Sequence, residues 1–143
     1  MNNLNLKVQK IHSNAILPNY AHCGDAGMDF FSIENAIINP GERKGIATGI
    51  KMAIPKGFVG LIWDKSGRAL TDGLKTMAGV IDSGYRGEVI IVLLNTSNKK
   101  MEIKIGFKIA QMLIQKVEQP KIKETNRLDK TSRGYSGFGS TGE

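Results

Sequence analysis

The sequence predicts an all-β fold, a sandwich or a barrel, followed by a flexible C-terminal arm. Three observations lead to this prediction. The 143-residue chain holds many short apolar segments separated by turn-forming residues, it contains 17 glycines, and no long segment has the periodicity of a helix. Many short strands within the length of one domain are typical of sandwiches and barrels.

The predicted strands follow one another along most of the chain. The first, residues 4–8, alternates apolar and polar side chains, as a half-buried strand does. The others are residues 28–33, 45–54, 58–63, 88–94, 101–105 and 109–117, with turn residues such as Asn39-Pro40-Gly41 between most of them. Residues 66–72 are expected to form a turn or two of helix at most.

The run from Val89 to Leu94 is apolar on both faces of its predicted strand. In a small all-β domain such a strand needs cover on both sides. Packing between two sheets is one solution, and packing against another subunit is the other. The run is therefore one indication of an oligomer.

The character of the chain changes after Val117. From residue 118 to residue 132 only Ile122 and Leu128 are large and apolar, so this stretch cannot bury enough surface to fold by itself. It leads into a glycine-rich segment at the C-terminus. We expect a β domain over residues 1–117 and an extended arm over residues 118–143. A plain disordered tail is the alternative.

Composition limits the partners and the compartment. The net charge is +7, and residues 99–143 hold ten Lys and Arg against five Asp and Glu. This excess suits a polyphosphate or a nucleic acid, or is simply a solvated basic surface. With few aromatics among the basic residues, a stacking platform for single strands is poorly supported. One cysteine, no apolar run of about 18 residues and no signal-peptide pattern predict a soluble, cytoplasmic protein without a membrane partner.

The C-terminal segment has the chemistry of a phosphate clasp. Glycines from Gly137 to Gly142 let backbone N–H groups converge on an anion, and Arg133 adds a fork-shaped donor suited to phosphate oxygens. Phe138 has the flat ring needed to cover a base. The chain contains no Walker-type phosphate loop.

Three further segments carry candidate chemistry, and each has an ordinary turn as its alternative. Residues 64–69 place Lys, Ser and Arg around a glycine at a strand end, where they suit phosphates. Residues 79–88 place Asp82 in a glycine-flanked hairpin, where it suits a general base. Asp25 and Asp29 lie four residues apart across a glycine and suit a hard cation or its waters.

Together, in order and spacing, these segments resemble the five motifs of the trimeric dUTPase family. The matching segments are Asp25–Asp29, Asp64–Ala69, Gly79–Glu88, Gly106–Gln111 and Arg133–Gly142. The resemblance implies a jelly-roll homotrimer with three sites shared between subunits. It also implies hydrolysis of dUTP to dUMP and pyrophosphate with Mg2+, with residues 1–117 as the catalytic domain and no nucleic acid required.

The resemblance also assigns roles to individual residues. Asp82 activates the water that attacks the α-phosphorus, and Asp29 holds waters of the magnesium ion. Tyr85 packs on the deoxyribose, the backbone of residues 79–85 reads the uracil edge, and Phe138 stacks on uracil. The residues expected to bind substrate are Lys65, Ser66, Gly67, Arg68, Thr76, Gly79, Val80, Ile81, Tyr85, Gln111, Arg133, Phe138, Gly139, Ser140 and Thr141.

The sequence departs from the family pattern at several positions. Lys65 stands where the second motif has Arg, and Arg68 stands where it has Leu. Lys keeps the charge but loses the bidentate geometry of Arg, and Arg68 is the alternative cation for the phosphates. In the fourth motif Phe107-Lys108 replaces Asp-Arg, in the fifth Ser136 replaces Gly, and Thr76 stands where many members carry Asn.

Three other functions compete with this interpretation. A dCTP deaminase shares the fold but needs a proton-shuttling carboxylate beside the pyrimidine, and Glu88 is the only nearby candidate. A non-catalytic nucleotide-binding module needs no base such as Asp82. A basic nucleic-acid-binding β domain explains the charge but not the order of the motifs.

Overall fold

The computed structural model describes residues 4–137 of the chain, and its regular secondary structure is β-strand except for one short helix. The elements in chain order are β1 (Lys7–Lys10), β2 (Met28–Phe31), β3 (Ala36–Ile38), β4 (Arg43–Ala53), β5 (Phe58–Trp63), α1 (Ser66–Asp72), β6 (Leu74–Met77), β7 (Val80–Ile81), β8 (Glu88–Asn95), β9 (Met101–Ile103) and β10 (Lys108–Lys116). The predicted all-β class is confirmed, and so is the short helix.

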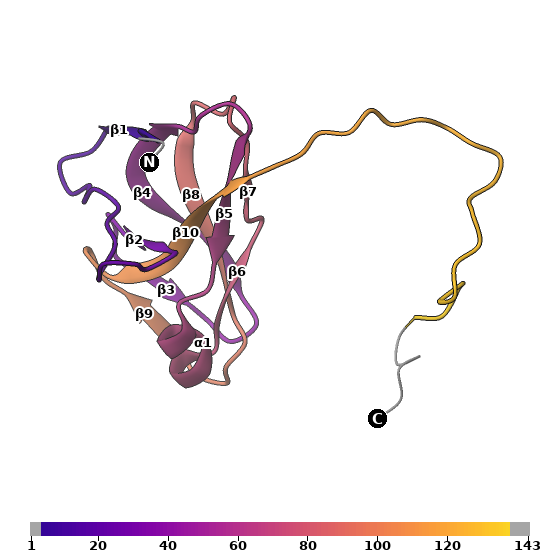
Figure 1. Cartoon of the computed structure of the whole chain (residues 1–143). Coiled ribbons are helices and arrows are strands. Elements are labelled where there is room, and N and C mark those ends of the chain that lie inside the picture. The colour runs from indigo at the N-terminus through magenta and orange to yellow at the C-terminus, as the bar shows by residue number, and fades with distance from the viewer. Residues whose placement is uncertain (1–3, 138–143) are drawn as a thin grey trace.

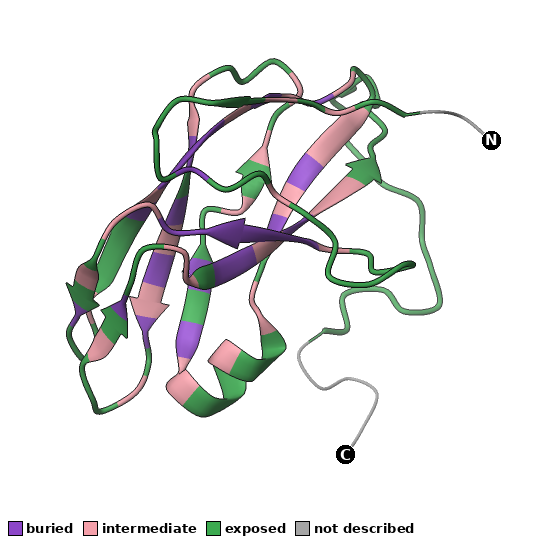
Figure 2. Ribbon diagram, turned by 90° about the vertical axis from the view of Figure 1, so that its left-hand side faces the viewer, coloured by how far each residue is buried: buried purple, intermediate pink, exposed green. Residues whose placement is uncertain are grey.

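Two four-stranded antiparallel sheets form the body of the molecule (Figure 1). One has the strand order β1-β4-β8-β6, the other has the order β2-β10-β5-β7, and β3 pairs with β9 in a small third sheet. Both large sheets contribute to one core, whose fully buried members include Phe30, Ile46, Leu93, Ile109 and Met112. Buried residues lie along the strands, whereas α1 is half-buried or exposed (Figure 2).

Strand β8 explains the long apolar run in the sequence. It pairs with β4 on one edge and with β6 on the other. Val89, Ile91 and Leu93 point into the core and are at most 1% exposed. On the opposite face Ile90 is 40% exposed. Within one chain, therefore, only one face of this strand is covered.

The strand boundaries differ from the predicted ones mainly where a strand is very short. The first strand was expected over residues 4–8 and is found at Lys7–Lys10, because its register against β4 fixes where pairing begins. Strands β3 and β6 were not predicted, since three or four residues carry too little periodicity to be read from sequence.

Beyond β10 the chain leaves the sheets as an extended segment (Figure 1). Residues 118–137 contain no strand or helix, and every one of them is exposed. Within residues 4–137, no helix has the length and apolar character needed to cross a membrane.

Asn95 gives a test of how the end of β8 is held. Its buried side-chain amide donates to the carbonyls of Ile38 (2.9 Å) and Lys99 (2.7 Å) and accepts from Ser97 N (2.9 Å) and Oγ (2.8 Å). Because Asn95→Ala leaves these groups without partners, we expect the free energy of unfolding to fall by about 2–3 kcal/mol. Urea denaturation measures this, with the exposed Asn98→Ala as control. A loss no larger than that of the control would contradict the prediction.

Candidate functional site

Three of the residues predicted to bind substrate, Lys65, Ser66 and Gln111, meet in one hollow. It has a volume of about 600 Å3 and is lined by residues that include Gly27, Asp29, Lys65, Ser66 and Gln111. It therefore brings together parts of the first, second and fourth predicted motifs. A second hollow of about 680 Å3, beside β3, β4 and β9, contains none of the predicted site residues. The chemistry of the lining points to the first hollow as the functional one.

Strand β10 brings these three segments together. Gln111 lies opposite Asp29 of β2 on one side and opposite Trp63 of β5 on the other. Its side-chain nitrogen donates to the backbone carbonyl of Asp64 at 2.8 Å. A β-carbon on Gly27 would collide with the Gln111 side chain, so the glycine leaves the space that Gln111 fills.

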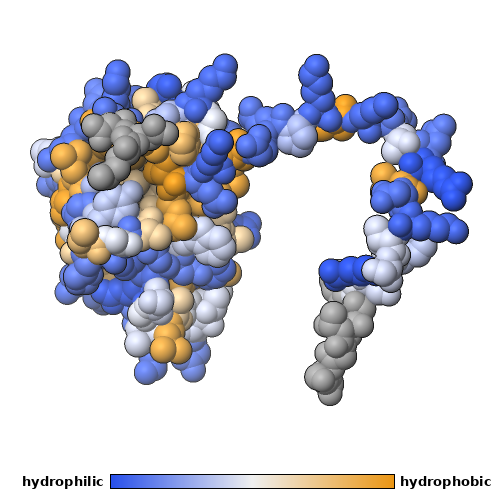
Figure 3. Space-filling model, viewed as in Figure 1, coloured by the Kyte–Doolittle hydropathy of each residue, from blue (hydrophilic) through white to orange (hydrophobic). Residues whose placement is uncertain are grey.

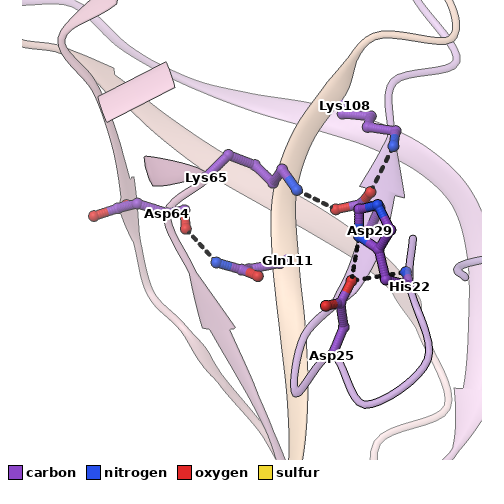
Figure 4. A network of polar contacts seen from close by, with 7 residues as sticks. All are labelled: His22, Asp25, Asp29, Asp64, Lys65, Lys108 and Gln111. Carbon is purple, nitrogen blue, oxygen red and sulfur yellow. Dashed lines mark hydrogen bonds and ion pairs between the residues drawn. The ribbon is translucent and has the colours of Figure 1, made fainter. Parts of the chain in front are cut away.

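Asp29 is a buried carboxylate between two lysines (Figure 4). Lys65 Nζ donates to Oδ1, and Lys108 Nζ forms an ion pair with Oδ2 at 2.8 Å. Burial by itself would raise the pKa of Asp29, but Lys108 and Lys65 outweigh this effect and lower it. The carboxylate is therefore ionised at neutral pH, and it holds two ammonium groups beside the hollow.

Asp64 connects the phosphate side of the site to strand β6. Its Oδ1 accepts from the backbone N–H of Thr76 at 2.6 Å and from the Thr76 hydroxyl at 2.7 Å, and its Oδ2 pairs with Lys75 at 2.8 Å. Burial would raise the pKa of Asp64, but Lys75 and Thr76 lower it. The Thr76 hydroxyl, predicted to lie near the base, is thus bonded to Asp64. Nothing in the sequence pattern indicated this contact.

Arg68 does not line the hollow. Its guanidinium lies 3.7 Å from the centre of the Phe107 ring, and its Nη1 is 2.9 Å from Asp72 Oδ2. Gly67, also predicted to bind substrate, is exposed at the start of α1 and does not line the hollow either.

The structure corrects the predicted hairpin at Asp82, because β7 and β8 belong to different sheets and residues 82–87 form a turn that connects them. This turn, called the Asp82 turn below, is braced by its own residues. Tyr85 N donates to the carbonyl of Asp82 at 3.0 Å, and Arg86 Nη1 donates to the carbonyls of Ser83 and Tyr85 at 2.7 and 2.8 Å. The Tyr85 hydroxyl donates to the carbonyl of Glu88 at 2.9 Å, which fixes the ring while leaving it 46% exposed. The Asp82 turn is therefore braced, and the Asp82 side chain on it is exposed.

Gly79, which precedes β7 and the Asp82 turn, is also constrained by its surroundings. The Gly79 carbonyl accepts from Ile62 N at 2.8 Å, and a β-carbon on Gly79 would come within 2.8 Å of the Ile62 carbonyl oxygen. Thr76, Gly79 and Val80 line a small hollow of about 230 Å3 on the predicted base side.

Within one chain the predicted site is divided. Val80, Ile81, Asp82 and Tyr85 line a hollow of about 200 Å3 that contains none of the phosphate-side residues. Arg133 lies in the exposed arm, where its Nε donates to the carbonyl of Ser136 at 3.0 Å. The predicted residues Phe138, Gly139, Ser140 and Thr141 lie outside the described residues.

The residues present suit magnesium only as an outer-sphere site. Residues 4–137 hold no cluster of three or more His, Cys, Asp or Glu side chains placed to bind a metal ion. Mg2+ commonly keeps several waters and uses one or two carboxylates together with substrate phosphates. Asp29 lines the hollow, and its buried Oδ2 accepts no well-aligned hydrogen bond despite the ion pair with Lys108. As a carboxylate that lines the hollow, Asp29 fits a partner for a magnesium-bound water.

Comparison with known proteins gives consistent matches. A sequence model described as dUTPase matches residues 13–142. Deoxyuridine 5'-triphosphate nucleotidohydrolase from Clostridium kluyveri is 49% identical over 141 residues, 97% of this chain and 99% of the relative. The Clostridium tetani protein of the same name is 43% identical over 145 residues and covers both chains fully.

Solved structures agree with these matches. The dUTPase of Staphylococcus bacteriophage 80alpha with dUPNHPP has a TM-score of 0.91 and 29% identity, with coverage of 97% of this chain and 99% of that chain. A mutant dUTPase from phage phi11 of S. aureus, described as revealing the coordination of a structural Mg(II) ion, has a TM-score of 0.82 and 28% identity, with coverage of 88% and 99%.

Asp64 gives a pH-dependent test of the connection between the two sides of the site. Because its pKa is lower in the folded chain than the ordinary value of 3.8, its carboxylate stabilises the fold above that value. This contribution is lost as the pH falls through the folded-state pKa. Asp64→Asn should therefore lower the free energy of unfolding by about 1–2 kcal/mol at pH 7, and the difference should shrink below about pH 4.

Urea denaturation of both proteins between pH 3 and pH 8 measures the effect of Asp64→Asn. Asp129→Asn serves as control, because it removes a carboxylate from the exposed arm. A difference between wild type and Asp64→Asn that stays constant across this pH range would contradict the assignment.

Proposed function

Because the chain belongs to the dUTPase family and is a dUTP pyrophosphohydrolase, we propose that it releases dUMP by water attack on the α-phosphorus, with Asp82 as general base and Mg2+ as cofactor. One observation supports the choice of Asp82. Within residues 4–137 its exposed carboxylate has no hydrogen-bond or ion-pair partner, while the backbone around it is braced. Such a carboxylate is free to accept the proton of a water.

The phosphate side of the site offsets the charge of the substrate. In this proposal Lys65, Ser66 and Gln111 contact the triphosphate in the hollow that they line. A lysine acts there as a point charge, without the bidentate geometry of an arginine. Asp29 would hold magnesium-bound waters through its oxygens at the hollow. Magnesium, when bound, neutralises charge on the phosphate oxygens and so favours attack by a nucleophile.

In this proposal the residues of β7 and the Asp82 turn select the nucleoside. The Tyr85 ring, fixed by its hydroxyl, would pack on the deoxyribose and leave no space for a 2′-hydroxyl. Since the Gly79 carbonyl is taken by Ile62, the uracil edge would be read by other backbone groups of residues 79–85. Glu88 does not suit the proton shuttle of a deaminase, because its Oε1 already accepts from Gly49 N at 2.7 Å.

The divided site supports a homotrimer in which neighbouring chains complete one another. Asp82 and Lys65 line different hollows of one chain. The face of the β body that Figure 3 shows carries an apolar area. Trp63 of β5 and Val80 of β7, which line one hollow together, are 53% and 65% exposed. Exposed apolar areas of this kind mark interaction sites. We infer that a second copy of the chain covers this face, and that its Asp82 turn lies at the phosphate-side hollow.

The arm would complete the site. Its exposed residues 118–137 reach away from the sheets, and Arg133 with the glycine-rich end would close over the triphosphate of a neighbouring site. The division into a catalytic domain of residues 1–117 and this arm, and the cytoplasmic location, are parts of the same proposal.

Asp82→Asn tests the general base. Because an amide does not accept the water's proton, we expect kcat to fall by about 10²- to 10⁴-fold while the Kd for a non-hydrolysable dUTP analogue stays near the wild-type value. Pyrophosphate release with dUTP and magnesium measures the activity, and Glu102→Gln on the remote strand β9 is the matched carboxylate control. Turnover within a fewfold of wild type would rule out this role for Asp82.

Mixed trimers test whether sites are shared. One inactive parent carries Asp82→Asn with an intact arm, and the other ends before Arg133 but keeps Asp82. After joint unfolding and refolding, some sites combine a good Asp82 with a good arm from different chains, so activity should reappear. Mixed trimers that form, as shown by native mass spectrometry, but stay as inactive as both parents would contradict the shared site.

A further inference from the structure

Helix α1 contributes no buried residue to the core, yet with its N-cap it places three residues of the phosphate-side hollow, Lys65, Ser66 and Ala69. Lys65 directly precedes it and Ser66 begins it. A helix of seven residues is too short to be stable through its own hydrogen bonds, and the side chain of its N-cap residue Lys65 makes no capping bond. Contacts with the rest of the chain therefore decide where α1 lies, and with it the position of Lys65 and Ser66.

Backbone groups tie down both ends of α1. Before the helix, the Asp64 carbonyl accepts from Gln111 Nε2 at 2.8 Å. After the helix, the Gly73 carbonyl accepts from Thr96 N at 2.8 Å and from the Thr96 hydroxyl at 2.7 Å. These bonds fix the entry and the exit of the segment but leave the side of the helix to be held by a side chain.

Arg68 supplies that contact in the middle of the helix. Its guanidinium lies 3.7 Å from the centre of the Phe107 ring, close enough for a strong cation–π interaction. Asp72, one turn later on the same helix, fixes the direction of the guanidinium with a bond of 2.9 Å to Nη1. With its face on the ring and Nη1 on Asp72, the guanidinium is directed to these two partners and does not line the phosphate-side hollow.

Phe107 is a firm platform for this contact. Its partly buried ring packs against the core. Its carbonyl accepts from Ser32 N and its own N–H donates to the Lys104 carbonyl, both at 3.0 Å. The ring therefore holds its place independently of Arg68, and α1 is the partner that gains a fixed position.

A second connection runs parallel to this one. Lys108, next to Phe107, pairs with Asp29, and the other oxygen of Asp29 accepts from Lys65. The segment that holds Lys65 is thus joined to residues 107–108 twice, once by charge through Asp29 and once by the stack of Arg68 on Phe107. Because Arg68 follows Lys65 closely and Phe107 precedes Lys108, the stacking of Arg68 on Phe107 helps to set the distance between Lys65 and Lys108.

We propose that Arg68 is a positioning residue that acts through the ring of Phe107 to hold Lys65 and Ser66 in place for the triphosphate, and that it does not bind phosphate itself. The two departures from the family pattern, Arg68 for Leu and Phe107 for Asp, are then one coupled pair, since the stack needs both side chains. This inference rests on the phosphate-binding role proposed for Lys65 and Ser66.

A double-mutant cycle tests the proposal in the full-length protein. The variants are Arg68→Leu, Phe107→Leu and the double variant, with Phe107→Tyr to retain a ring and Lys56→Leu to remove one positive charge from an exposed turn. Each is assayed for KM and kcat with dUTP and for the Kd of dUMP, which lacks the outer phosphates.

We expect each Leu variant to raise the KM for dUTP by roughly threefold to tenfold, with kcat and the Kd of dUMP changing much less. The double variant should be no worse than either single variant, because each removes the same contact. Phe107→Tyr should restore a KM near that of wild type. A purely structural defect would instead weaken dUMP and dUTP alike.

Three results would overturn the proposal. The first is that the increases in KM multiply in the double variant, and the second is that Arg68→Leu leaves the KM for dUTP unchanged. The third is that the Kd of dUMP rises as much as the KM for dUTP. Multiplying effects would mean that Arg68 contacts the phosphates independently of Phe107. Lys65→Met separates the proposal from its premise. If it leaves the KM for dUTP unchanged, the phosphate role of Lys65 fails and this inference fails with it. If Lys65→Met raises the KM for dUTP while the KM increases of Arg68→Leu and Phe107→Leu multiply in the double variant, only the role of Arg68 is wrong.

Discussion

Strand β10 pairs with β2 along one edge and with β5 along the other, and the arrangement of the site depends on this double pairing. The pairing places Gln111 between Asp29 and Trp63, so segments that lie more than thirty residues apart in the sequence become neighbours. A shift of one residue would turn Gln111 to the opposite face of the sheet. The hydrophobic face of β10, with Ile109 and Met112 in the core, therefore fixes the register of the polar site as well.

The buried carboxylate of Asp29 gives this arrangement its charge. A lone buried anion is expensive, and here two lysines compensate for it from either side. In return the anion gathers two ammonium groups, Lys65 and Lys108, that would otherwise repel each other. The group of three carries a net charge of +1 beside the hollow, which suits a substrate with several negative charges. One element thus serves both the packing of β2 and the electrostatics of the site.

The same chain keeps its base side apart from its phosphate side. Asp82 lies in the turn after β7, which is an edge strand of its sheet. Lys65 and Gln111 lie near β10, which is an interior strand of the same sheet. The exposed apolar side chains of Trp63 and Val80 lie between these regions. A site divided in this way, with an apolar surface at the division, is what subunits that complete one another would require.

The sequence by itself determined the β class, the short helix after β5, the glycine-flanked turn at Asp82 and the order of the five segments. These features are local, since turn residues, apolar alternation and motif spacing are all read within about ten residues. The tertiary structure alone decided that Asp29 lies between Lys65 and Lys108, that Thr76 is bonded to Asp64, and that Arg68 stacks on Phe107. Each of these contacts joins residues that are distant in the chain, and no local pattern says which distant residues meet. The short strands β3 and β6 were missed for the same reason, because it is pairing with a neighbouring strand that stabilises them.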